Sequence, residues 1–235
     1  MKIGITLPSF AHSAAPVLAR AREAEEAGID GVFAFDHLWP GDDRSRPALS
    51  LYPTLGAVAA ATTTIRVGSL VARLGLVPDE VVLESLLTLS ELSGGRLVAA
   101  LGVGDAKSRS ENRAYGIAWP PPEARRSSLA RILGGLAGAG IEAWVGATGA
   151  ATLAVARDAG ATVNLWEADL GRLRSEAGRG PTTWAGPLPR EPGAAADRLS
   201  ELSSAGASWA IWGWPSSIDL VTAALARAGI QAGRT

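Results

Sequence analysis

The sequence predicts a single (β/α)8, or TIM, barrel of the α/β class. Three observations support this fold class. Short apolar runs alternate with helix-forming segments along all 235 residues, and strict alternation of this kind produces a parallel sheet. Runs such as residues 31–35 contain no polar residue, which is typical of strands that are buried on both faces. No linker or charge run divides the chain, so we expect one domain over residues 1–235 with short loops and few insertions.

The first half of the chain contains four of the expected strands. Residues 2–7 form the first one, which ends at Pro8 and Ser9. The helix at residues 16–27 is rich in alanine, glutamate and arginine and stops at Gly28, a residue type that commonly follows a helix. The other elements expected in this half are strands at residues 31–35, 65–71 and 96–101 and helices at residues 53–61 and 79–90.

The second half continues the alternation after three prolines at residues 120–122. Its strands are short apolar runs that are each followed by a helix-forming segment. Strands are expected at residues 142–145, 162–165, 182–185 and 208–212, and helices at residues 123–136, 149–158, 169–177, 193–204 and 216–228. The sixth and seventh strands have the weakest patterns, so an open, doubly wound sheet is the alternative arrangement.

Composition excludes several classes of function. The formal net charge of -1 argues against a broad affinity for nucleic acid or acidic membranes. The absence of cysteine excludes disulfides and thiolate metal sites. No apolar run reaches the roughly 18 residues of a membrane helix, and the chain starts with a strand-like run instead of a signal peptide. We therefore expect a soluble cytoplasmic protein.

Polar residues gather where the strand at residues 96–101 ends. Gly102 and Gly104 are followed by Asp105 and by further charged and serine residues up to Gly116. In parallel α/β folds, the loops that leave the carboxyl ends of the strands carry the chemistry. The sequence therefore predicts a functional site at this end of the barrel.

Residues 92–97, Leu-Ser-Gly-Gly-Arg-Leu, and residues 101–104, Leu-Gly-Val-Gly, resemble a region of the luciferase-like monooxygenases, a family of flavin- and deazaflavin-dependent barrel enzymes. Segments at residues 35–39, 64–71 and 143–146 resemble the same family in the same order. The Asp36-His37 pair is similar to the branch that depends on coenzyme F420. The resemblance implies hydride transfer between C5 of the deazaflavin and a small organic substrate, without a metal ion. It also implies a homodimer, and FMN is the alternative cofactor.

His37 is the first candidate for proton transfer, because imidazole titrates near neutral pH. Asp36 lies beside it and is expected to orient the ring. Trp39 is expected either to stack on the substrate or to cover the second helix. Glu111 lies where the resemblance implies an acidic residue near the site, and a solvated glutamate is the alternative. The second histidine, His12, is expected to be an exposed loop residue.

The resemblance places the cofactor along the exits of the third, fourth and fifth strands. It implies a cis peptide bond at Leu70-Val71 or at its neighbour Ser69-Leu70, with an ordinary trans strand end as the alternative. Glycines would allow the backbone to approach a ring or a phosphate closely, and the helix at residues 149–158 could bind a phosphate through its first amides. The predicted cofactor-binding residues are Ser69, Leu70, Val71, Gly102, Gly104, Asp105, Gly146 and Ala147.

A shortened barrel that binds a partner without catalysis is the alternative to an enzyme. Members of the family are longer and carry insertions that cover the cofactor, and this chain has little room for them. Three tryptophans near the last strand do not by themselves indicate an aromatic cage. Trp209 is expected to face away from Trp212 and Trp214, because side chains alternate along a strand.

Overall fold

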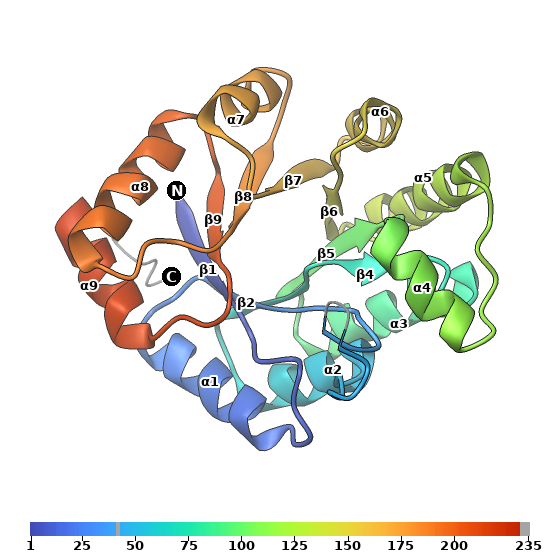
Figure 1. Cartoon of the computed structure of the whole chain (residues 1–235), viewed down its shortest axis with the longest axis horizontal. Coiled ribbons are helices and arrows are strands. Elements are labelled where there is room, and N and C mark those ends of the chain that lie inside the picture. Colours follow the sequence, from blue (N-terminus) through green and yellow to red (C-terminus); the bar gives the residue numbers. More distant parts are fainter. Residues whose placement is uncertain (41–42, 231–235) are drawn as a thin grey trace.

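Nine strands and nine helices follow one another in the described part of the chain, residues 1–40 and 43–230, in the computed structural model (Figure 1). The strands are β1 (Lys2–Thr6), β2 (Gly31–Ala34), β3 (Arg66–Ser69), β4 (Ala72–Arg73), β5 (Leu97–Gly102), β6 (Glu142–Gly146), β7 (Thr162–Trp166), β8 (Thr182–Gly186) and β9 (Trp209–Trp212). The helices are α1 (Ala15–Glu26), α2 (Leu51–Ala61), α3 (Asp79–Leu92), α4 (Ala106–Ala114), α5 (Pro122–Gly138), α6 (Ala150–Asp158), α7 (Leu170–Ala177), α8 (Pro192–Ser204) and α9 (Ile218–Ala228).

The strands form a closed parallel barrel with the helices outside it (Figure 1). Their order in the sheet is β3-β2-β1-β9-β8-β7-β6-β5-β4, and β3 also pairs with β5. In that pairing Val67 lies opposite Leu97, which joins the two ends of the sheet. The predicted (β/α)8 barrel is therefore confirmed, and the open sheet is wrong because the β3–β5 pairing leaves no free edge at β3.

The third expected strand, residues 65–71, contains β3, and β4 follows just beyond it; Leu70 and Val71 separate the two. The peptide bond between these two residues is cis, so the predicted position of that bond is confirmed. Beyond it, β4 pairs with the end of β5, with Arg73 opposite Gly102. This arrangement carries Arg73 to the rim of the barrel at the carboxyl end of the strands.

Helix α4 is an element that the sequence analysis did not separate from the polar stretch after β5. The segment has no apolar stripe by which a helix could be recognised. Its start is instead fixed by a capping box, in which the Asp105 side chain accepts from the backbone N–H of Ser108 while the Ser108 side chain accepts from that of Asp105. Such reciprocal hydrogen bonds satisfy amides that the first turn of a helix leaves without partners.

Aromatic rings fill the interior of the barrel below the rim. The ring of Phe33 lies 5.4 Å from that of Trp144 and 5.8 Å from that of Trp209, measured between centroids. A Cβ atom at Gly4 or Gly68 would lie 2.7 Å from the Phe33 ring, so only glycine leaves room for it. These rings fill the barrel below its rim. A ligand can therefore lie above them, at the carboxyl ends of the strands.

A second apolar layer lies between the strands and the surrounding helices. Trp212 belongs to this outer layer, whereas Trp209 belongs to the interior cluster. The prediction that these two side chains face opposite ways is confirmed, as strand alternation requires. None of the helices in the described part of the chain combines the length and the apolar character needed to span a bilayer.

Candidate active site

A cavity of about 750 Å³ opens at the carboxyl ends of the strands. Its walls come from the segments that follow β1, β2, β3, β5 and β6 and from residues of β4 and β7, so residues far apart in the sequence meet there. Its volume lies within the range of roughly 300–1,000 Å³ that is common for cofactor and substrate pockets. The predicted site residues that line it are Asp36, His37, Leu70, Val71, Gly102, Gly104, Asp105, Glu111, Gly146 and Ala147.

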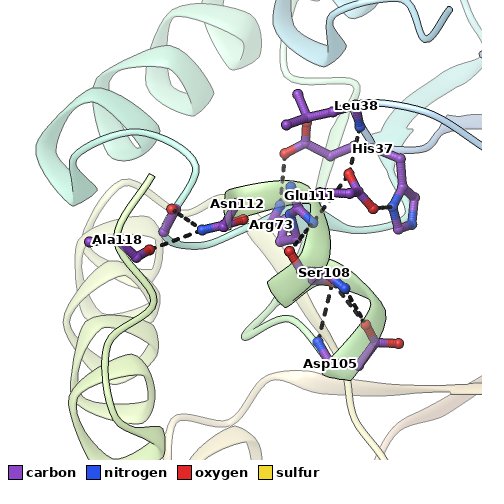
Figure 2. A network of polar contacts seen from close by, with 10 residues as sticks. His37, Leu38, Arg73, Asp105, Ser108, Glu111, Asn112 and Ala118 are labelled. Atoms are coloured by element: carbon purple, nitrogen blue, oxygen red, sulfur yellow. Dashed lines mark hydrogen bonds and ion pairs between the residues drawn. The ribbon is translucent and has the colours of Figure 1, made fainter. Parts of the chain in front are cut away.

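His37 and Glu111 form a hydrogen-bonded pair at the edge of this cavity (Figure 2). Nδ1 of His37 lies 2.7 Å from Oε1 of Glu111, although 74 residues separate the two in the sequence. The His37 side chain is 37% exposed and the Glu111 side chain only 2%. The imidazole can therefore reach a ligand in the cavity, while the carboxylate is buried behind it.

The Glu111 carboxylate is held by two further groups. Its Oε2 atom accepts a hydrogen bond of 2.7 Å from the backbone N–H of Leu38 and lies 3.3 Å from Nη1 of Arg73. Burial raises the pKa of Glu111, but the hydrogen bonds from His37 and Leu38 and the charges of His37 and Arg73 outweigh burial and lower it. Glu111 is therefore a carboxylate at neutral pH, and a carboxylate can only accept hydrogen bonds. The proton of this hydrogen bond must then lie on Nδ1 of His37.

Asp36 does not orient His37, which corrects the expectation from their adjacency. The Oδ2 atom of Asp36 accepts a hydrogen bond of 2.8 Å from the backbone N–H of Arg73. Successive side chains at the end of an extended strand point in opposite directions, so the two neighbours take different partners. Burial raises the pKa of Asp36, and the N–H and the charge of Arg73 only partly oppose this effect.

Helix α4 delivers Glu111 to the site because both of its ends are anchored (Figure 2). At its start, the Asp105 carboxylate accepts 2.9 Å hydrogen bonds from the backbone N–H and the hydroxyl of Ser108. Near its end, the Asn112 amide donates 3.0 Å hydrogen bonds to the carbonyl groups of Gly75 and Ala118. Asp105 lines the cavity, and its hydrogen bonds to Ser108 position the helix that carries Glu111.

The side chain of Val71 lies against the ends of β5 and β6 and lines the cavity. A Cβ atom at Gly102 would lie 2.4 Å from Cγ2 of Val71, and one at Gly146 would lie 2.8 Å from its Cγ1. Only glycine at both positions leaves room for this side chain, since real Cβ contacts are longer. The glycines therefore allow a smooth apolar surface on one side of the cavity.

The family model of the luciferase-like monooxygenases matches residues 1–148. The chain belongs to this family. Among curated relatives of this luciferase-like protein, an F420-dependent glucose-6-phosphate dehydrogenase of Beutenbergia cavernae is 38% identical over 111 residues, 46% of this chain and 32% of the relative. A 5,10-methylenetetrahydromethanopterin reductase of Methanolobus tindarius is 33% identical over 119 residues, 50% of this chain and 33% of the relative. The matched region thus spans about a third of these relatives.

Solved structures of other proteins share the fold of this luciferase-like chain. An F420-dependent secondary alcohol dehydrogenase in complex with an F420-acetone adduct gives a TM-score of 0.77 at 14% identity, covering 97% of this chain and 98% of that one. A coenzyme F420-dependent tetrahydromethanopterin reductase of Methanopyrus kandleri gives 0.74 at 14% identity, covering 94% and 96%. At this level of identity the similarity describes the fold alone.

Two of the predicted site residues lie outside the cavity of this luciferase-like barrel. Trp39 is only 4% exposed, and its ring lies 5.9 Å from the ring of Tyr115 and 4.9 Å from the guanidinium carbon of Arg44. Ser69 is fully buried and donates a 2.7 Å hydrogen bond to the carbonyl of Ala100. Both side chains pack inside the protein. Their positions near strand ends in the sequence do not show whether they face the cavity or the interior.

The sequence analysis missed several residues that line the cavity, including three aromatic side chains and Arg73. Phe10 and Phe35 stack with 5.9 Å between their centroids, and Trp166 meets Phe35 edge to face at the same distance, so the three form an aromatic wall. Arg73 is the one charged residue in the otherwise apolar run of residues 70–74, and that contrast could have identified it. Residues 41–42 and the side chains of residues 106–107 lie outside the described part of the site. Among the described residues, no cluster of histidine, aspartate and glutamate could hold a metal ion.

Proposed function

We propose that this protein is an F420-dependent oxidoreductase that transfers a hydride between C5 of the deazaflavin and a small organic substrate. The observation that carries the proposal is the 2.7 Å hydrogen bond between Nδ1 of His37 and the buried Glu111 carboxylate. The pair lies at a cavity in the position where barrel enzymes carry out their chemistry. The names of the curated relatives favour F420 over FMN.

The residues of the cavity fit a planar redox cofactor. Val71, with glycines on both sides of it, offers an apolar surface against which a ring could lie. Gly149 is the N-cap residue of α6 and lines the cavity, and as a glycine it has no side chain that could cap the helix. The free amides of such a helix start can bind a phosphate oxygen. Val71, Gly102 and Gly146 would thus hold the ring, and residues 147–149 a phosphate group.

A bound deazaflavin would supply the hydride chemistry, which no protein side chain can provide. The protein then has to accept or donate a proton at the substrate. Because Nδ1 of His37 carries the proton shared with Glu111, Nε2 is the nitrogen that can accept one from a substrate hydroxyl. The Glu111 carboxylate stabilises the imidazolium that results, and in the reverse direction Nε2 returns the proton.

The aromatic wall lies beside this proton-transfer site and would limit access of water to it once a ligand fills the cavity. Phe10 stands between Phe35 and His37, with 6.3 Å between its ring centroid and that of His37. Exclusion of water strengthens the charge interactions inside a site and protects reactive species from hydrolysis. The open cavity beside an exposed imidazole favours this enzymatic function over a barrel that only binds a partner.

Parallel anaerobic titrations with F420 and FMN test the cofactor. We expect quenching of F420 fluorescence with saturation at micromolar cofactor and no comparable response to FMN. Absence of F420 binding at these concentrations would overturn the proposal, and tight FMN binding alone would assign the protein to the FMN-dependent enzymes.

Turnover of the wild-type protein and of His37→Asn tests proton transfer. Glucose 6-phosphate and 2-propanol are the first substrates to try, because relatives and structural neighbours are named for such reactions. We expect His37→Asn to lower kcat by roughly 10²- to 10⁴-fold, the usual contribution of a general acid or base, with little change in F420 affinity. His12→Asn, a change at the other, exposed histidine, should leave kcat unchanged. Unchanged turnover in His37→Asn would contradict its assigned function.

A further inference from the structure

Arg73 is a buried cation behind the His37–Glu111 pair. It ends β4, lines the cavity and is 3% exposed. Its Nη1 atom lies 3.3 Å from Oε2 of Glu111 and donates a weak 3.4 Å hydrogen bond to the carbonyl of Ser108. Its Nε and Nη2 atoms have no hydrogen-bond partner among the described residues. Arg73 therefore interacts with its surroundings mainly through charge.

Arg96 shows what an arginine with a structural function looks like in the same barrel. All three of its nitrogens donate hydrogen bonds, to the carbonyl groups of residues 59, 62, 65 and 93 and to the hydroxyl of Thr62. Arg73 leaves two nitrogens unsatisfied although it is more deeply buried. Removal of a guanidinium from water is costly unless hydrogen bonds or charges compensate it. Simple packing therefore does not account for Arg73.

Carboxylates on three other segments face Arg73. They belong to Asp36 after β2, Asp105 after β5 and Glu111 on α4, and His37 is the other titratable group at Glu111. Tyr52 on α2 faces Asp36. Burial lowers the pKa of Arg73, while the charges of Glu111, Asp36 and Asp105 oppose that shift. The charge of Arg73, 3.3 Å from Oε2 of Glu111, thus adds to the hydrogen bonds from His37 and Leu38 and to the charge of His37 in favouring the ionised form of this buried carboxylate.

We propose that Arg73 is a positioning residue for proton transfer: it keeps Glu111 ionised, and the ionised Glu111 keeps the proton of His37 on Nδ1. The catalytic part of this inference rests on the proposed function, whereas its effect on His37 is independent of any cofactor. Without the charge of Arg73, Glu111 takes up a proton from solvent more readily. A protonated Glu111 can donate to Nδ1, so the imidazole proton moves to Nε2 and that nitrogen can no longer accept one.

Nitrogen-15 NMR of the imidazole rings in the cofactor-free protein tests this inference. We compare the wild-type protein with Arg73→Met, which removes the charge, and Arg73→Lys, which retains it. Arg66→Met is the matched control, because Arg66 forms a 2.7 Å ion pair with Glu142 at the other end of the barrel. His12 serves as the internal reference in every sample.

The wild-type, Arg73→Lys and Arg66→Met proteins should show His37 with its proton on Nδ1 at neutral pH. In Arg73→Met, the His37 signals should shift toward the form with the proton on Nε2, while the His12 signals stay in place. A folded Arg73→Met protein with unchanged His37 signals would overturn the inference. If that variant does not fold, the carboxyl carbon-13 signal of Glu111 in the wild-type protein provides the test. The inference requires this signal to show a carboxylate at mildly acidic pH. A protonated Glu111 at that pH would also overturn the inference.

Turnover gives a second measurement where the protein binds F420. Arg73→Met should lower kcat by about 10- to 100-fold, less than the loss of His37 itself, with a changed pH profile of kcat and little change in KM. Arg73→Lys should restore most of the activity. Failure to bind F420 would contradict the proposed function alone, because the NMR comparison needs no cofactor.

Discussion

The Cγ2 atom of Val71 occupies the space that a side chain at Gly102 would need. A Cβ atom on Gly102 would lie 2.4 Å from it, and Val71 also lines the cavity. The residue type at position 102 on β5 therefore affects the shape of the cavity, because it determines where the Val71 side chain can lie. This relationship makes the wall of the site sensitive to a single methyl group.

Gly102→Ala should lower the free energy of unfolding by about 1–3 kcal/mol, the usual cost of overpacking a core. The added methyl must displace Val71, which should also weaken ligand binding. Urea denaturation measures the stability. The double variant Gly102→Ala/Val71→Ala removes the clashing γ carbons and should recover part of the loss. Gly134→Ala is the control, because nothing lies within 4 Å of the added atom and alanine stabilises a helix by roughly 0.5–1 kcal/mol relative to glycine. A loss in the control as large as in Gly102→Ala would contradict the steric explanation.

Asp36→Asn should stabilise the protein at neutral pH. Because burial raises the pKa of Asp36 in the folded state, folding favours its protonated form. The protonated Asp36 side chain makes its full contribution to the free energy of unfolding below the unfolded pKa of about 3.9. This contribution is lost as the pH rises through the raised pKa of the folded state. Asparagine carries no charge and can still accept the hydrogen bond from the backbone of Arg73. Urea denaturation at several pH values should give a stability difference between variant and wild type that shrinks as the pH falls toward the unfolded pKa. A variant that is less stable at neutral pH would refute this account.

Glu25→Gln should show the opposite pH dependence. The Oε1 atom of Glu25 accepts hydrogen bonds of 2.8, 2.6 and 3.0 Å from the backbone N–H groups of Thr63, Thr64 and Ile65. Burial raises its pKa, but these hydrogen bonds outweigh burial and lower it. Its contribution is therefore present above the unfolded pKa of about 4.3 and is lost as the pH falls through the lowered folded pKa.

Thermal unfolding over a pH series checks the Glu25 prediction. The variant should be less stable than the wild-type protein at neutral pH, and the two curves should converge in acid. Glu26→Gln changes an exposed neighbour on the same helix and should follow the wild-type curve. Parallel curves for wild-type and Glu25→Gln proteins at all pH values would show that the charge of Glu25 is not the cause.

Arg96→Met should destabilise the protein by more than about 3 kcal/mol. Arg96 satisfies several carbonyl groups at the junction of α2, α3 and β3, and each buried acceptor left without a donor costs about 1–3 kcal/mol. Urea denaturation measures the loss. Arg198→Met removes an ion pair with the exposed Glu201 side chain and should change stability by less than about 1 kcal/mol. Similar small losses in both variants would show that the Arg96 hydrogen bonds contribute little.

Local patterns were sufficient for most of the fold. Apolar runs such as residues 97–101 identify buried strands because only a sheet covered on both faces tolerates them. Helix α4 escaped this reasoning, because its stability depends on a capping box and on anchoring by Asn112 instead of an apolar stripe. The cis peptide bond at Leu70-Val71 was implied by the family resemblance and not by the residue pattern, and the division into β3 and β4 was not predicted at all.

For the site, the sequence analysis predicted the end of the barrel at which the cavity opens, and ten of its twelve predicted site residues line that cavity. It assigned the wrong partner to His37, because Asp36 is adjacent in the chain whereas Glu111 is adjacent in space. It also gave no indication that Trp39 packs against Tyr115. Contacts of this kind depend on where a loop or helix from another unit comes to lie.

The sequence by itself determined the order of strands and helices and the edge at which polar groups gather, because hydrophobic periodicity and glycine positions act over a few residues. Only the tertiary structure decided that Glu111 binds His37 and that Arg73 lies behind them. These pairings join segments 74 and 38 residues apart. They depend on the closure of the barrel and on the orientation of α4, which no local pattern encodes.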